Sequence, residues 1–142
     1  MLYTDEITGW IKTNLATPVL KSGMPILDLG TLPIVEQLDM NNGWRHVVVD
    51  CGKLQPTGMS SLSLSFHQGQ LKYVSASMAT PGESPLFTHQ RHTSYLQKNL
   101  TGPCTTSPSG ISYNYPWGNI GAHYDPRNDS ASIVVRWLDN ME

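Results

Sequence analysis

Residues 61–78 read SLSLSFHQGQLKYVSASM, and this stretch decides the fold class. Leucine and phenylalanine alternate with serine over 61–66, and a period of two is typical of a strand with one buried face. Gln68-Gly69 supplies a tight turn, and residues 71–78 return as a second strand. We therefore predict a β-hairpin whose outer face carries hydroxyl groups.

Two further strands are predicted, one before and one after this hairpin in the sequence. Residues 46–51 (HVVVDC) form a short β-branched run, which indicates a buried strand. Near the end of the chain, Ala131, Ile133, Val135 and Trp137 alternate with more polar residues. Because a terminal strand is ordered only when it is paired, we expect 131–137 to lie antiparallel beside the central strands.

The remaining elements are predicted from helical signals. Thr4 is a suitable N-cap and acidic residues follow it, while Ile7, Trp10, Ile11 and Leu15 recur at helical spacing. Pro33–Leu38 fits a short helix with proline at its first position, and residues 86–99 fit one or two helical turns. The predicted fold is one α+β domain over 1–142: a mainly antiparallel sheet, an N-terminal helix packed on it, and long irregular loops.

From Asn99 to Tyr124 the sequence contains no formally charged residue. Its aromatic side chains stand among Ser, Thr, Asn, Gly and Pro, the composition of a recognition loop. The residues predicted to contact a partner are Tyr113, Tyr115, Trp117, Asn119 and Tyr124. The alternative is a long loop folded back over the core with its aromatic side chains buried.

Charge is scarce in the whole chain, at 14% against roughly 25% in ordinary soluble domains. Interfaces are depleted in charge and enriched in aromatic residues and Met, and this chain has four Trp, six Tyr and six Met. The composition therefore favours self-association or another protein as the partner. A monomer with an uncharged polar surface is the alternative.

Other partners and compartments are disfavoured. The net charge is −2 and the basic residues are scattered, so nucleic acid is not expected as a partner. No apolar stretch approaches the 18 residues or so of a membrane span, and the N-terminus lacks the pattern of a signal peptide. A cytoplasmic or virion location follows, with Cys51 and Cys104 as free thiols and Cys51 buried in a strand.

Two short histidine pairs are the candidates for a metal site. His89 and His92 share a face of a helical turn, and His123 and Asp125 share a face of a strand. Imidazole and carboxylate ligands suit zinc or another first-row metal. The structural alternative places the first pair on a polar loop and Asp125 at the start of a turn, so no metal or cofactor is predicted.

The residues taken together favour a non-enzymatic binding or assembly protein. The candidates are a viral or phage structural subunit and a protein-binding inhibitor, either acting through the uncharged aromatic loop. A carbohydrate-binding module is the first alternative, because tyrosine and tryptophan faces stack on sugar rings. The second alternative is a small metal-dependent hydrolase that uses His89, His92, His123 and Asp125.

Overall fold

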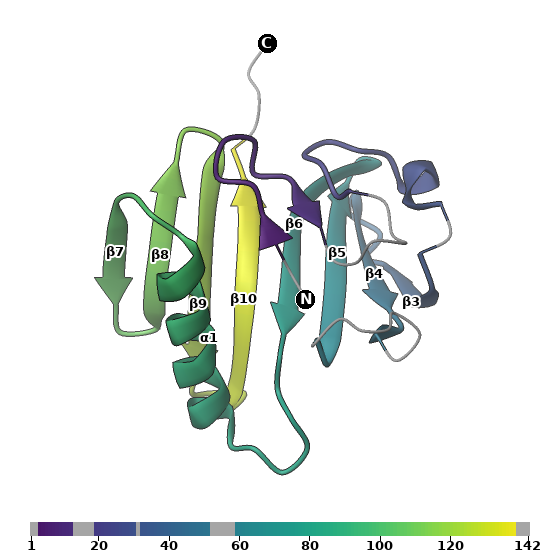
Figure 1. Cartoon of the computed structure of the whole chain (residues 1–142). Helices are drawn as coiled ribbons and strands as arrows, with labels where there is room; N and C mark the ends of the chain where they lie inside the picture. The colour runs from purple at the N-terminus through teal and green to yellow at the C-terminus, as the bar shows by residue number, and fades with distance from the viewer. Residues whose placement is uncertain (1–2, 13–18, 31, 52–58, 139–142) are drawn as a thin grey trace.

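An eight-stranded antiparallel sheet forms the body of the protein in a computed structural model that describes residues 3–12, 19–30, 32–51 and 59–138 (Figure 1). Across the sheet the order of strands is β3-β4-β5-β6-β10-β9-β8-β7. Their bounds are β3 (Ile34–Asp39), β4 (Trp44–Val49), β5 (Ser61–His67), β6 (Gln70–Ser77), β10 (Ser130–Trp137), β9 (Gly118–Asp125), β8 (Gly110–Tyr115) and β7 (Cys104–Ser107). The described residues also form α1 (Pro85–Asn99), the short 3₁₀ helix η1 (Ile26–Leu29), and the small strands β1 (Tyr3–Thr4) and β2 (Ile11–Lys12).

The predicted hairpin and the predicted terminal strand are both confirmed. β5 and β6 pair antiparallel around Gln68-Gly69, with Leu64 opposite Val74. β10 lies between β6 and β9, where Val135 is opposite Val74 on one side and Ile120 on the other. The alternating apolar residues of β5 and β10 are buried, namely Leu62, Leu64, Phe66, Ile133, Val135 and Trp137, so the period of two in the sequence identifies the buried face correctly.

The predicted N-terminal helix is wrong. Residues 3–12 form the two short strands β1 and β2, joined by a turn in which the Asp5 carboxylate accepts hydrogen bonds from the N–H groups of Ile7 and Thr8. Gly9 has φ +75°, which right-handed helix excludes. Ile11 is buried while Ile7 is 89% exposed, so the two do not share a buried stripe. Leu15 lies outside the described residues.

Three further predicted elements differ from the structure. Residues 34–39 are the strand β3, not a short helix. The polar segment after the hairpin forms a helix of 15 residues, longer than predicted, which Ser84 caps by accepting from the N–H of Phe87. The segment from Asn99 to Tyr124 is not an irregular loop, because it holds β7, β8 and most of β9.

No helix in the described residues has the length and apolar character needed to cross a membrane.

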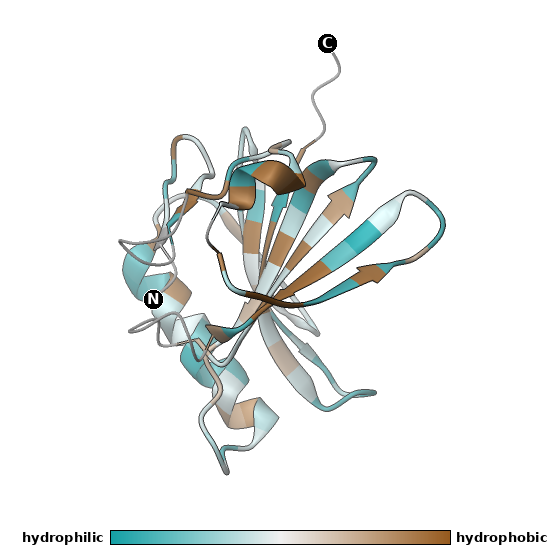
Figure 2. Ribbon diagram, turned by 90° about the vertical axis from the view of Figure 1, so that its right-hand side faces the viewer, coloured by the Kyte–Doolittle hydropathy of each residue, from teal (hydrophilic) through white to brown (hydrophobic). Residues whose placement is uncertain are grey.

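The sheet has one covered face and one uncovered face. α1 packs on β9 and β10, and residues 19–30 lie over the end of the sheet nearer β5 and β6. Figure 2, which looks toward the β3 edge, shows α1 on one side of the sheet and no described helix or strand on the other. The uncovered face carries His46, Ser63, Ser65, Tyr73, Ser75, Ser112, Asn114, Asn119, His123, Ser132, Val134 and Arg136. The protein is therefore mostly β, with its single described α-helix after the first six strands rather than at the N-terminus.

Candidate protein-binding surface

The aromatic residues predicted to form a recognition loop lie on strands β8 and β9 and on the turn between them. Tyr113 is in the core, with 6% of its surface exposed. The rings of Tyr115 and Trp117 stack on each other, with their centroids 5.3 Å apart and their planes at 10°. Both rings are partly buried against the core. The turn at Pro116-Trp117 thus holds a fixed aromatic pair rather than a flexible loop.

The N-terminal segment takes up much of the polar chemistry of this pair. Trp117 donates its Nε1–H to the carbonyl oxygen of Glu6 at 2.8 Å, and the Tyr115 hydroxyl donates to the carbonyl of Thr101 at 2.6 Å. Burial, followed by the nearby Glu6 carboxylate, raises the pKa of Tyr115 to about 12. The two rings therefore join β8 and β9 to the first residues of the chain.

The other two residues of that predicted set lie on opposite faces of β9. Asn119 stands opposite Asn114 and Arg136 on the uncovered face. Tyr124 lies toward α1, with its ring 6.0 Å from that of His89, and its hydroxyl donates to Asp129 at 2.8 Å. Partner contact through Asn119, Tyr124, Tyr115 or Trp117 stays a prediction.

The structure does not bring the four candidate metal ligands together. His92 is fully buried under α1, where its Nε2 accepts from the Met78 N–H at 2.9 Å. His89 lies on the same helix, whereas His123 lies over Gly121 on the uncovered face of the sheet. Asp125 accepts hydrogen bonds within its own turn from the Arg127 N–H and the Asn128 amide. Among the described residues no three His, Cys, Asp or Glu side chains are placed to share a metal ion.

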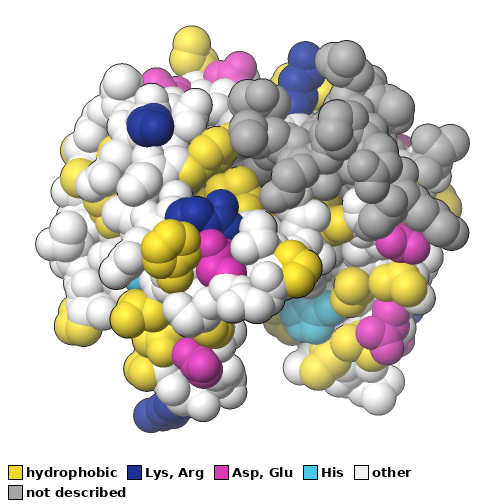
Figure 3. All heavy atoms as spheres, turned by 60° about the horizontal axis from the view of Figure 1, so that its bottom comes forward, with side chains coloured by type: hydrophobic (Ala, Val, Ile, Leu, Met, Phe, Trp, Pro, Cys, Tyr) yellow, Lys and Arg dark blue, Asp and Glu magenta, His cyan; other side chains and the backbone are white. Residues whose placement is uncertain are grey.

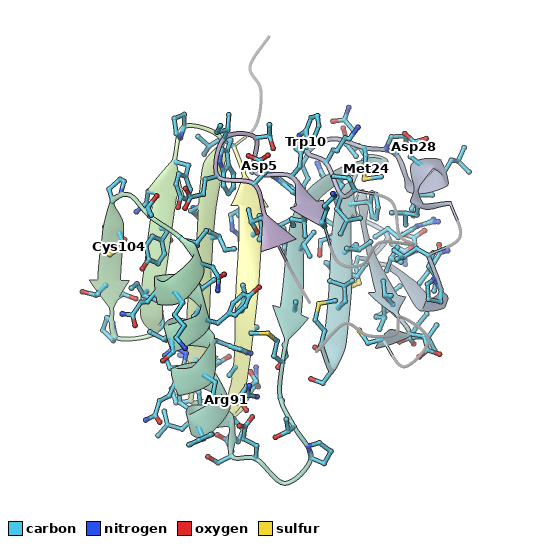
Figure 4. All side chains as sticks on the ribbon, in the orientation of Figure 1. Asp5, Trp10, Met24, Asp28, Arg91 and Cys104 are labelled. Carbon is cyan, nitrogen blue, oxygen red and sulfur yellow. The ribbon has the colours of Figure 1, made fainter. Side chains whose placement is uncertain are left out.

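The two cysteines are free thiols, as predicted. Cys51 is buried, but it lies just beyond the end of β4 rather than in a strand as predicted, and Cys104 is exposed on the edge strand β7 (Figure 4). Burial, followed by the neighbouring Asp50 carboxylate, raises the pKa of the Cys51 thiol. A thiol with a raised pKa and little exposure is a weak nucleophile.

An aromatic cluster that the sequence did not reveal stands on the uncovered face, at the end of β4. The ring of Trp44 lies 4.7 Å from that of His67 and 5.8 Å from that of Tyr73, and the Arg136 guanidinium lies 4.6 Å above the Tyr73 ring. Ser65 is only 2% exposed and its hydroxyl is 2.8 Å from His46 Nδ1. These contacts pack side chains of β4, β5, β6 and β10 against one another on the uncovered face.

The edge strand β3 carries the largest group of exposed apolar side chains in the described residues. All six of its residues are exposed. With its neighbours it contributes half of the large hydrophobic residues that are exposed in the described part of the chain. These five residues, which we call the β3 edge surface, are Leu27, Ile34, Val35, Leu38 and Met40. Apolar groups gathered on one edge are typical of a contact site, because single exposed apolar residues are usually scattered.

An open hollow of about 520 Å³ adjoins this surface between η1 and the ends of β3, β4 and β5. Leu27 lines one side of the hollow, and Trp44, Arg45 and Phe66 line the other. Leu27 is 89% exposed, so its side chain contributes little to the fold. Tryptophan and arginine at such a depression are the residue types that contribute most to binding at protein interfaces.

The charge near this surface is acidic. Asp28 lies on η1 (Figure 4), and Glu36 and Asp39 lie on β3. Asp39 pairs with Arg45 at 3.3 Å, and a hydrogen bond from the Asn41 N–H, followed by Arg45, lowers the pKa of its carboxyl group. Glu36 has no hydrogen bond or ion pair with the described residues. Figure 3 shows acidic and basic side chains scattered over the face that it views, and Glu36 differs from Asp39 in having no basic partner among the described residues.

The comparisons with known proteins show the fold and not the family. No protein-family model matches the chain, and no curated protein matches it. Among solved structures, the chain resembles one chain of the structure described as Rhs1-CT in complex with cognate immunity protein RhsI1. The TM-score is 0.54 at 14% identity, over 96% of this chain and 87% of the other. Likeness at this level of identity shows that the fold is shared.

Proposed function

We propose that this chain is a protein-binding inhibitor of the immunity-protein type, which holds a cognate partner protein at the β3 edge surface. The observation that carries the proposal is the gathering of exposed apolar side chains on one edge strand, beside a hollow lined by Trp44 and Arg45. A central apolar anchor next to Trp and Arg is the usual composition of an interface core.

Two further observations support this function. The fold resembles that of a chain from a complex between two cognate proteins. The chain also has few charged residues, and charge is depleted at interface cores. The viral or phage alternatives have no comparable support, and neither self-association nor carbohydrate binding draws on a described contact.

The test begins with identification of the partner. The tagged chain is crosslinked in its source cells and recovered, and the crosslinked protein is then produced and purified separately. Calorimetry of the two purified proteins should give a one-to-one complex. The partner's own activity should fall in proportion to the complex formed. A partner that binds but keeps full activity would rule out an inhibitory role.

Two matched variants test whether the partner binds at the β3 edge surface. Leu27 and Ile7 are both 89% exposed, but Leu27 belongs to the β3 edge surface and Ile7 lies in the turn between β1 and β2. Leu27→Asp should weaken binding by about tenfold or more, because it puts a charge at an apolar contact. Ile7→Asp should leave both binding and melting temperature unchanged. Equal affinities for the two variants would remove the β3 edge surface from the interface.

A further inference from the structure

We infer that β3 receives an extended segment of the partner as a ninth strand, and that this segment places a lysine or arginine opposite Glu36. The inference rests on the proposed function and adds to it the mode of contact and the chemistry of the occupant. Addition of a strand to a free sheet edge is a recurring mode of peptide recognition, in which main-chain hydrogen bonds supply affinity and side chains supply specificity.

The backbone of β3 is oriented to accept such a strand. Met40 donates its N–H to the carbonyl of Trp44 at 3.0 Å, so its main-chain groups point inward to β4. Main-chain groups alternate in direction along a strand. The N–H and C=O groups of Gln37 and Asp39 therefore point outward, away from β4. β3 is the last strand in the sheet order, so the described residues provide no strand to pair with them.

A backbone bulge in β3 limits where the added strand can pair. The ladder to β4 shifts its register between Ile34 and Glu36, which marks a bulge at Val35. Bulges interrupt pairing along an edge, so the regular segment open to a new strand runs over residues 36–39. There Glu36 and Leu38 share the uncovered face, because they stand opposite Val48 and His46. The occupant therefore presents a cation and an apolar side chain, two residues apart, on that face.

The absence of a cation in β3 favours a strand from a partner protein over a strand from a second copy of this chain. β3 reads IVEQLD and contains no cation, so no register of one β3 against another gives Glu36 an opposite charge. Like or unpaired charges across a ladder disfavour pairing. The opposite edge of the sheet is a poor alternative, because β7 exposes the residues CTTS and offers neither an acidic group nor a large apolar side chain.

Two synthetic peptides test the occupant directly. The first carries lysine and valine in turn along one face (acetyl-Thr-Lys-Thr-Val-Thr-Lys-Thr-Val-Thr-amide), and the second has glutamate in place of lysine. Binding to the full chain is measured by NMR titration, and amide hydrogen exchange is measured with and without peptide. The lysine peptide should bind at least about fivefold more tightly than the glutamate peptide, the difference expected for favourable against unfavourable cross-strand charge. It should also slow exchange at the N–H groups of Gln37 and Asp39.

Matched proline variants test the backbone pairing. Gln37→Pro removes an outward N–H without touching the ladder to β4, because edge positions that face solvent tolerate proline. The main-chain N–H of Asn114 donates to the carbonyl of Pro103, so the main-chain groups of Pro103 point toward β8. Because these groups alternate along a strand, the N–H of Thr106 points outward on β7. Thr106→Pro is therefore the equivalent change on the other edge. Gln37→Pro should weaken the lysine peptide by about tenfold, whereas Thr106→Pro should change its affinity by less than about twofold.

A charge reversal keeps the proposal testable if the proline variant is poorly folded. Glu36→Lys should invert the preference, so that the glutamate peptide binds more tightly than the lysine peptide. Equal binding of both peptides, or peptide protection of β7 instead of β3, would overturn the inference. Protection of Gln37 and Asp39 that rises with protein concentration without peptide would overturn it in favour of a second copy.

The failure of this inference is distinguishable from failure of the proposed function. If the crosslinked partner binds Gln37→Pro and Glu36→Lys as tightly as the parent chain, while Leu27→Asp still weakens it, strand addition is wrong and the inhibitor function stands. If the partner keeps full activity in the complex, the inhibitor function is wrong whatever the peptides show.

Discussion

Acid should destabilise this protein through His92 before it acts on the carboxylates. His92 is fully buried, and its Nε2 accepts a hydrogen bond from the Met78 N–H at 2.9 Å. The neutral ring therefore carries its proton on Nδ1, which makes no hydrogen bond with the described residues. Burial is the largest cause that lowers the pKa of His92 to about 4, followed by the positive charge of Arg91 and the neighbouring His89, against the opposing effect of Glu83.

The size of the effect follows from the difference between the folded and unfolded pKa values. The unfolded chain protonates His92 near pH 6.5, whereas the folded chain keeps it neutral down to about pH 4. Over that window the unfolded state binds more protons, so stability falls as the pH falls. From pH 7.5 to pH 5 the contribution of His92 to the loss is about 2 kcal/mol. That is a substantial share of the roughly 5–15 kcal/mol that holds a domain folded.

The assay is urea unfolding followed by tryptophan fluorescence at several pH values between 7.5 and 5. His92→Gln is the control, because the amide oxygen of Gln can accept from Met78 but does not titrate. The variant should lose much less stability over this range, and the decline that remains belongs to His89 and His123, whose pKa values burial also lowers. Glu83 acts in a separate window, because Arg91 holds its pKa at about 2. If His92→Gln declines as steeply as the parent, the reasoning is refuted.

Three smaller perturbations test how the N-terminal segment is held. Gly9→Ala should lower the melting temperature by several degrees, because φ is +75° and a Cβ atom would stand 2.4 Å from the Trp117 ring. Trp137→Phe should cost about 1 kcal/mol in urea unfolding, since it removes the Nε1–H donated to the Gly9 carbonyl at 2.8 Å. Trp117→Ala should lower the melting temperature through loss of its packing and of its bond to Glu6. A Trp117→Ala chain that melts like the parent but binds the partner weakly would instead place recognition on β8 and β9.

The sequence predicted the strands in which apolar and hydroxyl residues alternate most sharply. In β5 the contrast between leucine and serine is complete, and in β10 the apolar set at Ile133, Val135 and Trp137 is equally regular. β8 and β9 follow the same period, with Ile111, Tyr113 and Ile120 buried. Their other face carries Ser, Asn and Gly rather than charge, so the alternation has low contrast. This is why two paired strands were predicted to be an irregular loop.

Local signals could not separate a turn from a helix at the N-terminus. An acidic side chain that accepts from N–H groups two and three residues ahead serves an Asx turn as well as a helix cap, and Asp5 does the former. What decides between them is distant in sequence. Gly9 packs against Trp117, and its carbonyl accepts from Trp137, so the segment lies beside the start of β9 and the end of β10. No local pattern contains that information.

The sequence did not predict the β3 edge surface for a related reason. Residues 34–39 suit a strand or a short helix, and only the order of the strands makes β3 an edge. The aromatic cluster beside it depends equally on register, because Trp44, His67 and Tyr73 meet across three strands. Exposure of Val35 and Leu38 is thus a property of the assembled sheet, whereas sequence patterns report only on neighbours along the chain.

The structure also changes the meaning of the low charge. In the sequence, 14% charge was evidence for burial against partners. The uncovered face of the sheet now accounts for part of that scarcity, because its rows of serine and asparagine meet water without charge. Composition by itself therefore no longer separates a partner-bound subunit from a monomer with a polar surface. The argument for a partner moves from how many charges the chain has to where its apolar groups lie. On β3 those groups stand on an edge whose outward N–H and C=O groups have no described strand to pair with, beside Glu36, which has no ion pair within the described ranges. Charge on an edge strand also protects a monomer from pairing, so the exposed Ile34, Val35 and Leu38 beside that charge are what favour a strand-binding edge.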